Sequence, residues 1–190
     1  VNNMGVVTAL SSGTATFTFT NSLTGCSNTT PPITVNPQPT VTNLGSDTIC
    51  IGNTTNLTPS TGGTWSTSDA SIATVTNSGL VTGIAGGTAK LVFNETSTGC
   101  NSDTITITVT PRPTTSVVGS DSICVFSTTQ MSPSTGGTWV SSAPLVASIN
   151  NQGQIIGQNQ GSARFRFTNS NGCLSDLSQP LSVNGAPVVS

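Results

Sequence analysis

The sequence predicts an all-β protein made of small antiparallel β-sandwich modules in tandem. Charged residues make up only 5% of the chain, and its polar part is mainly Thr, Ser and Asn, with 20 Gly and 11 Pro. Thr favours the pleated surface of strands, whereas Gly, Pro and Asn favour turns. Many short segments alternate apolar and polar residues, which is typical of half-buried strands. The chain also repeats itself with a period of about 74 residues, which indicates serial modules.

The repeat is defined by Trp, Cys and Gly at matched positions. Residues 40–113 return at 114–187, and the second half of the repeat occurs once more in residues 1–39. The matched residues are Cys50 with Cys124, Trp65 with Trp139, Gly5 with Gly79 and Gly153, Gly13 with Gly87 and Gly161, and Cys26 with Cys100 and Cys173. We therefore expect the second half of a module in 1–39 and full modules in 40–112 and 113–190.

The half-module is expected to hold only the later strands of a sandwich, which alone would expose a sheet edge. We therefore expect its first half to lie in upstream sequence of the same long chain. We call the three parts the half-module (1–39), the middle module (40–112) and the last module (113–190).

Alternation within the repeat predicts which side chains form the core. In the segment GTAKLVF, the apolar residues Ala89, Leu91 and Phe93 fall on one face, and Lys90 falls on the other. Ala163, Phe165 and Phe167 repeat this pattern in the last module, and Ala15, Phe17 and Phe19 repeat it in the half-module. Sandwiches often place a Trp in the core. The predicted core therefore includes Trp65, Trp139, Phe93 and Phe167.

Five Cys in a chain without His favour disulfides over a metal site, and we expect no cofactor. One periodic pairing lies within modules (Cys50–Cys100, Cys124–Cys173), and another bridges modules (Cys26–Cys50, Cys100–Cys124). Cys100 begins a strand of about nine residues, which places it about 30 Å from the next module. A disulfide can join Cα atoms that lie within about 7 Å of each other. We expect Cys50 near the pole where the chain enters its own module, where Cys100 also begins its strand. We therefore predict one disulfide within each full module and no partner for Cys26 in this sequence.

Composition excludes several functions. Binding to nucleic acid requires clustered Lys and Arg, but this chain has four basic residues and a net charge of −2. No apolar run approaches the roughly 20 residues needed to span a bilayer, so we expect no membrane insertion in this segment. Nucleophilic catalysis usually needs a base, most often His, and this chain has no His. We therefore expect no enzyme activity. Stable disulfides indicate an extracellular or envelope compartment.

Two alternatives concern ligands. Asp47 with Asp103, and Asp121 with Asp176, recur near the cysteines and could supply oxygen ligands to Ca²⁺; the competing interpretation is that each Asp caps a turn. The two Trp side chains could stack on sugar rings if they were exposed, whereas the strand pattern places them in the core.

The stretch from Gly62 to Phe93, GGTWSTSDASIATVTNSGLVTGIAGGTAKLVF, resembles the bacterial Ig-like group 2 (BIg2) repeat. That family commonly reads a Trp, serines, an "xATV" strand, a "GLVTG" turn and then "GTAxxxF". The last module departs at GQIIG, residues 153–157, but keeps both glycines. The resemblance implies Ig-like sandwiches of about 74 residues.

The linkers Pro37-Gln38-Pro39 and Pro111-Arg112-Pro113, with the added Cys pair, resemble the repeats of giant SprB-type adhesins. Those adhesins belong to gliding Bacteroidetes and are exported by type IX secretion. The resemblance implies an outer-surface filament that grips a substratum and is moved by the gliding motor.

Short Pro-x-Pro linkers favour an extended, semi-rigid string of modules. We expect the stalk or filament of a secreted cell-surface adhesin, whose partners are neighbouring modules of the same chain and surface polysaccharide or a substratum. A glycan-binding module would instead show an exposed aromatic cluster or an ordered ion. A laterally packed sheath or surface-layer protein would show repeated side-to-side contacts.

Overall fold

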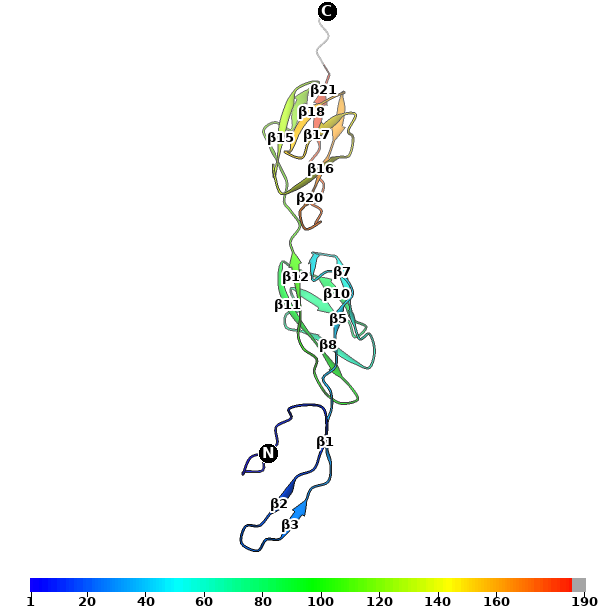
Figure 1. Ribbon diagram of the computed structural model, residues 1–190. Helices are drawn as coiled ribbons and strands as arrows, with labels where there is room; N and C mark the ends of the chain where they lie inside the picture. The colour runs from blue at the N-terminus through cyan, green and yellow to red at the C-terminus, as the bar shows by residue number, and fades with distance from the viewer. Residues whose placement is uncertain (186–190) are drawn as a thin grey trace, which may run out of the picture.

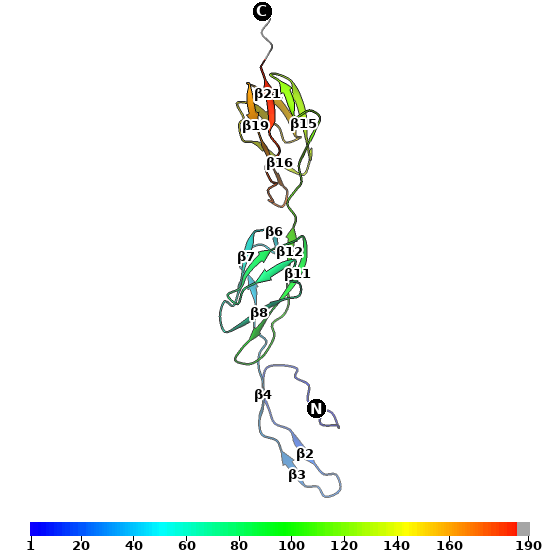
Figure 2. The same cartoon turned by 180° about the vertical axis from the view of Figure 1, so that it is seen from behind.

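A computed structural model describes residues 1–185, so the last five residues of the predicted last module lie outside the described part. The chain is elongated, with the three parts following one another from end to end (Figures 1 and 2). The described residues form strands and contain no helix. Two separate clusters of buried apolar residues, one in each full module, form the cores.

The middle module is a sandwich of two four-stranded sheets. One sheet has the order β5-β7-β10-β9 and the other β6-β12-β11-β8. The strands are β5 (Thr42–Asn43), β6 (Thr48–Cys50), β7 (Thr54–Thr58), β8 (Gly63–Thr67), β9 (Ala73–Val75), β10 (Leu80–Gly83), β11 (Gly87–Glu95) and β12 (Ile105–Thr110).

Alternation along β11 decides which side chains enter the core of the middle module. Ala89, Leu91 and Phe93 are buried, whereas Lys90 points to solvent. Phe93 faces Trp65 across the β11–β8 pair, with the ring centroids 5.3 Å apart and tilted. The indole Nε1–H of Trp65 donates to the carbonyl of Pro59 at 2.9 Å, so the buried polar atom keeps a partner.

The last module repeats this arrangement at the equivalent positions. One sheet has the order β13-β15-β18-β17, and the facing layer consists of β14-β21-β19 and the pair β16-β20. Trp139 packs on Phe167 with ring centroids 5.1 Å apart, and its Nε1–H donates to Pro133. The strands are β13 (Ser116–Val118), β14 (Ser122–Cys124), β15 (Thr128–Ser132), β16 (Gly137–Ser141), β17 (Ala147–Ile149), β18 (Gln154–Gly157), β19 (Gly161–Ala163), β20 (Phe165–Asn169) and β21 (Leu181–Asn184).

The half-module contains two short antiparallel pairs, β1 (Gly13–Ala15) with β4 (Ile33–Val35) and β2 (Thr18–Thr20) with β3 (Ser27–Thr29). Its β1–β4 register matches that of β11 and β12 one period later. Phe19 is nevertheless 76% exposed, whereas Phe93 at the equivalent position is 1% exposed. The alternation is therefore present without the facing sheet that would cover it.

One pair of strands in each full module is parallel, which differs from the purely antiparallel sandwich that the sequence predicts. β6 runs parallel to β12, with Cys50 opposite Thr110, and β14 runs parallel to β21, with Cys124 opposite Asn184. Since β12 ends at the linker, Cys50 lies at the pole where the chain leaves the module. We call this the C-terminal pole, and the opposite end the N-terminal pole.

Candidate functional site

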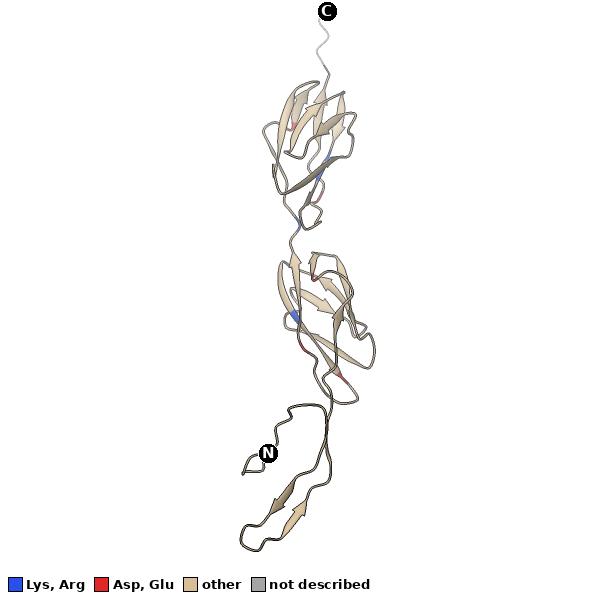
Figure 3. Cartoon of the chain, in the orientation of Figure 1, with Lys and Arg blue, Asp and Glu red and all other residues tan. Residues whose placement is uncertain are grey.

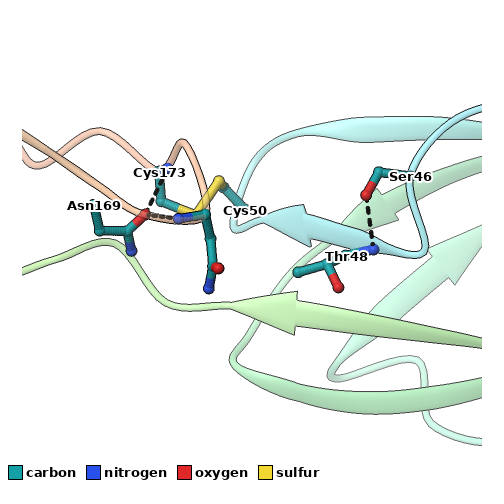
Figure 4. The surroundings of a disulfide bond; sticks show 6 residues. Ser46, Thr48, Cys50, Asn169 and Cys173 are labelled. Atoms are coloured by element: carbon teal, nitrogen blue, oxygen red, sulfur yellow. Dashed lines mark hydrogen bonds between the residues drawn. A yellow bond between two sulfur atoms is a disulfide. The ribbon is translucent and has the colours of Figure 1, made fainter. Parts of the chain in front are cut away.

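The junction between the middle and last modules carries a disulfide that crosses from one module to the other. Cys50 ends β6 at the C-terminal pole of the middle module, and Cys173 lies in the turn that follows β20. The two are bonded with a Cα–Cα distance of 5.5 Å, across a sequence separation of 123 residues (Figure 4). The junction therefore has two covalent connections, the linker and the disulfide.

The predicted pairing of Cys50 with Cys100, and of Cys124 with Cys173, is wrong. Cys50 is bonded to Cys173, and within the described residues Cys26, Cys100 and Cys124 are free. The prediction assumed that Cys50 lies at the N-terminal pole, beside Cys100. Because β6 runs parallel to β12, Cys50 instead lies at the C-terminal pole, while Cys100 precedes β12 at the other end.

Local hydrogen bonds fix the turn that presents Cys173. The side-chain Oδ1 of Asn169 accepts the backbone N–H groups of Asn171 at 3.0 Å and Cys173 at 2.9 Å. The N–H of Asn169 donates to the carbonyl of Cys173 at 3.0 Å, which closes the turn. Gly172 adopts a φ of 78°, a conformation that suits glycine.

The linker adds a polar contact beside the disulfide. The guanidinium of Arg112 lies 3.2 Å from the carboxylate of Asp176, in an otherwise sparsely charged chain (Figure 3). Both side chains are more than half exposed, so the ion pair stabilises the fold weakly. At the preceding junction the side-chain amide of Gln38 donates to Asp103 at 3.0 Å. The middle residue of each Pro-x-Pro linker thus contacts the Asp that precedes the last strand of the following module.

The acidic residues considered as Ca²⁺ ligands do not converge. Asp47 accepts a hydrogen bond from the side-chain amide of Asn43 at 2.7 Å, while Asp103 and Asp176 contact the linkers. Asp121 accepts the N–H of Ser182 through its backbone carbonyl. Residues 1–185 contain no group of three or more His, Cys, Asp or Glu that could hold a metal ion. Sequence reasoning missed the linker contacts, although Asp103 and Asp176 recur at one repeat position.

The aromatic side chains considered for sugar stacking are in the cores. Trp65 and Trp139 are 6% and 5% exposed, and Phe93 and Phe167 are buried beneath them. In the full modules, Phe126 is the one exposed aromatic side chain of the described residues. The described part of the chain also has no helix long and apolar enough to cross a membrane.

No family model and no curated protein matches this sequence. Among solved structures, the chain is similar to the C-terminal 282-residue fragment of intimin in complex with the translocated intimin receptor's intimin-binding domain, at 12% identity and a TM-score of 0.50, covering 77% of this chain. Invasin, a bacterial integrin-binding protein, is similar at 18% identity and a TM-score of 0.44, and domains 4 and 5 of the S-layer protein SbsC at 18% and 0.29. Those two matches cover 84% and 70% of this chain, and 82% of the SbsC domains. The chain spans 64% of the intimin fragment and 43% of invasin.

The likeness to intimin and the two-sheet architecture define the class of the protein. It consists of tandem Ig-like β-sandwich modules. At 12% identity the comparison with intimin establishes the fold alone. In this chain a disulfide joins consecutive modules.

Proposed function

We propose that this chain is a stalk segment of a long cell-surface adhesin, located outside the cell. Its modules hold an adhesive tip away from the cell body and transmit tension to it. Three observations support the proposal: the end-to-end arrangement of modules, the disulfide between them, and the similarity in fold to intimin. A structural role of this kind requires no catalytic residues.

The inter-module disulfide is the observation that carries the proposal. Under tension, force that enters at Cys50 passes through the sulfur atoms to Cys173, so residues 51–172 carry none of it. Unfolding of that segment then does not lengthen the chain. A stalk that must keep its length under load benefits from such a bypass. An oxidising extracellular compartment also preserves the bond.

We further propose that the adhesin is of the SprB type, exported by type IX secretion and used in gliding motility. Its support is the sequence resemblance of the Pro-x-Pro linkers and of the group 2 Ig-like segment. The partners are then neighbouring modules of the same chain, with surface polysaccharide or a substratum at the tip.

Glycan binding and lateral packing remain the competing functions. The burial of both Trp side chains removes the aromatic stacking surface that the glycan hypothesis required of them. Side-to-side packing into a sheath would require repeated contacts between chains. The end-to-end junction closed by the Cys50–Cys173 disulfide favours a filament of single chains.

Deletion of one period, residues 40–113, from the full-length surface protein tests the proposal. We expect filaments shorter by one module in electron micrographs, with export and attachment to a surface retained. Cells that export the shortened protein at normal levels but no longer attach would instead assign recognition to this module. The gliding speed of the same cells on agar tests the proposed role in gliding. Normal gliding by cells that lack the entire protein would contradict that role.

A further inference from the structure

We propose that Cys100 and Cys124 are half-sites of two more inter-module disulfides of the Cys50–Cys173 kind. Cys124 would bond the last cysteine of a module that follows, and Cys100 the first cysteine of the module to which residues 1–39 belong. Every full module would then be bonded to both neighbours. This inference concerns thiol chemistry at the junctions and does not depend on adhesion.

Cys124 has the local structure of Cys50. Both end a short strand parallel to the last strand of the module, opposite Asn184 and Thr110 respectively, which are equivalent residues. The carbonyl of Cys50 accepts the N–H of Asn53 at 2.9 Å, and that of Cys124 accepts the N–H of Ser127 at 3.0 Å. Cys124 is therefore placed at the C-terminal pole of the last module as Cys50 is in the middle module.

Cys100 has the local structure of Cys173. Each closes the turn that follows β11 or β20. The carbonyl of Cys100 accepts the N–H of Glu95 at 2.9 Å, and the carbonyl of Cys173 accepts the N–H of Asn169 at 3.0 Å. The residue before each cysteine is a glycine with positive φ, 71° for Gly99 and 78° for Gly172. The turn at Cys100 is one residue longer, but it presents the cysteine at the same N-terminal pole.

The junction itself repeats, which is independent of the cysteines. Gln38 contacts Asp103 at the first junction as Arg112 contacts Asp176 at the second, although one pair is neutral–charged and the other is ionic. The linker therefore leaves one module and meets the next through equivalent positions at both junctions. A completed first module would bring its first cysteine to the pole that faces Cys100.

The exposure of the cysteines agrees with the proposal that Cys100 and Cys124 lack their bonding partners in this chain. Cys50 and Cys173 are 8% and 1% exposed where the two modules meet. Cys124 is exposed and Cys100 is half-buried. Cys100 and Cys124 cannot form a disulfide with each other within one chain, because Cys100 lies at the N-terminal pole of the middle module and Cys124 at the C-terminal pole of the last module.

The proposed bonds would make the filament nearly inextensible. When such a filament is pulled, the tension follows the shortest covalent path. That path crosses one junction through a disulfide that ends at Cys100, and it crosses the next through the backbone from Cys100 to Cys124. About 24 residues, or about 80 Å, would then be the longest reach for two modules. Two unbonded modules of about 74 residues each would extend to about 500 Å. The expected change is therefore about sixfold.

Formation of each bond needs a disulfide oxidant, such as glutathione disulfide. The thiolate of one cysteine attacks the oxidant, forming a mixed disulfide and releasing one glutathione thiolate. The second cysteine's thiolate then attacks the protein sulfur and releases the other glutathione. Two cysteine thiols are oxidised by two electrons, and one glutathione disulfide is reduced to two thiols.

The first test extends the present chain with a copy of residues 40–74 placed before Val1, which completes the half-module and supplies one new cysteine. After refolding with a glutathione redox buffer, non-reducing peptide mapping is expected to join the new cysteine to Cys100. The present chain has three free cysteines. The extended chain has one cysteine and one bond more, so reactive thiols per chain fall to two. In the Cys100→Ser version the new cysteine stays free.

A second extension keeps the inference falsifiable if the completed half-module fails to fold. A copy of residues 114–187 placed after Pro187 supplies an intact module, and its last cysteine is expected to bond Cys124. Cys100 left free in the first extended chain, or Cys124 left free in the second, would overturn the inference if the added module has folded and Cys50–Cys173 has formed. Disulfide-linked dimers through Cys124 would also overturn it, because they would assign that thiol to contacts between chains.

Discussion

Cys50 lies opposite Thr110 in the parallel pair formed by β6 and β12, so the disulfide and the linker leave the middle module at the same pole. Two covalent connections side by side restrict bending and rotation about the junction more than a Pro-x-Pro linker does alone. The contact of Arg112 with Asp176 lies at the same place and acts with them. The three-residue strand β6 therefore places the sulfur atom that joins the middle module to the last.

The bypass predicts how the present chain extends under force. Pulled from its two ends, the oxidised chain is expected to be shorter at full extension by about 400 Å than the reduced chain, because 123 residues of backbone are excluded from the taut path. Single-molecule force spectroscopy with and without a reductant measures the difference. Cys124→Ser is the matched control and should leave it unchanged, whereas equal lengths in both states would contradict the assigned pairing.

Much of the sandwich is predictable from the sequence, and the junction is not. Alternation predicts that Leu91 and Phe93 face the core, and both are buried. The pairing of Cys50 failed because alternation gives the faces of a strand but not its direction relative to distant strands. A usable signal was the segment from Thr40 to Cys50, whose ten residue steps at about 3.3 Å each are long enough to reach across a module. Phe19 is exposed because no facing sheet covers the half-module, although the residues around Phe19 alternate as those around Phe93 do.

The adjacent glycines Gly62, just before β8, and Gly63, its first residue, should respond differently to substitution by alanine. At Gly63 an added Cβ would overlap the carbonyl oxygen of Asn94 and the ring of Phe93, both fixed in the core sheet. At Gly62, with φ at 84°, the added Cβ would contact nothing. We expect Gly63→Ala to lower the free energy of unfolding by about 3 kcal/mol and Gly62→Ala by about 1 kcal/mol. Urea denaturation of the two variants measures this, and equal losses would refute the packing argument.

The side chain of Ser102 makes the hydrogen bond to Phe93 that a neighbouring strand would otherwise make, at the edge of the core. Its hydroxyl oxygen accepts the N–H of Phe93 at 3.0 Å, and its O–H donates to the carbonyl of Asp103 at 2.7 Å. Ser102→Ala would leave the buried N–H of Phe93 without a partner, and we expect a loss of about 1–3 kcal/mol in the stability of the middle module. Hydrogen exchange at the Phe93 amide should accelerate.

The last module supplies the internal reference for that experiment, because Ser175 makes the same two bonds, to Phe167 and Asp176. Exchange at the Phe167 amide should not change in the Ser102→Ala chain. The exposed neighbour Ser97 provides the control substitution, Ser97→Ala, with no expected effect. Unaltered exchange at Phe93 in Ser102→Ala would show that the hydroxyl is dispensable.

Asp69 gives the middle module a pH dependence that the last module lacks at the equivalent position, Ala143. The side-chain hydroxyl and the backbone N–H of Ser71 both donate to the Asp69 carboxylate, at 2.6 and 2.9 Å, and hold its pKa below the ordinary value of 3.8. Because the folded pKa is lowered, the stabilisation is present above the unfolded pKa and is lost as the pH falls through the folded pKa. Ser71→Ala removes the hydroxyl donor, so the pKa of Asp69 should rise toward its ordinary value. An NMR titration of the Asp69 carboxyl carbon in both chains measures the shift, and identical titration curves would rule out the Ser71 hydroxyl as its cause.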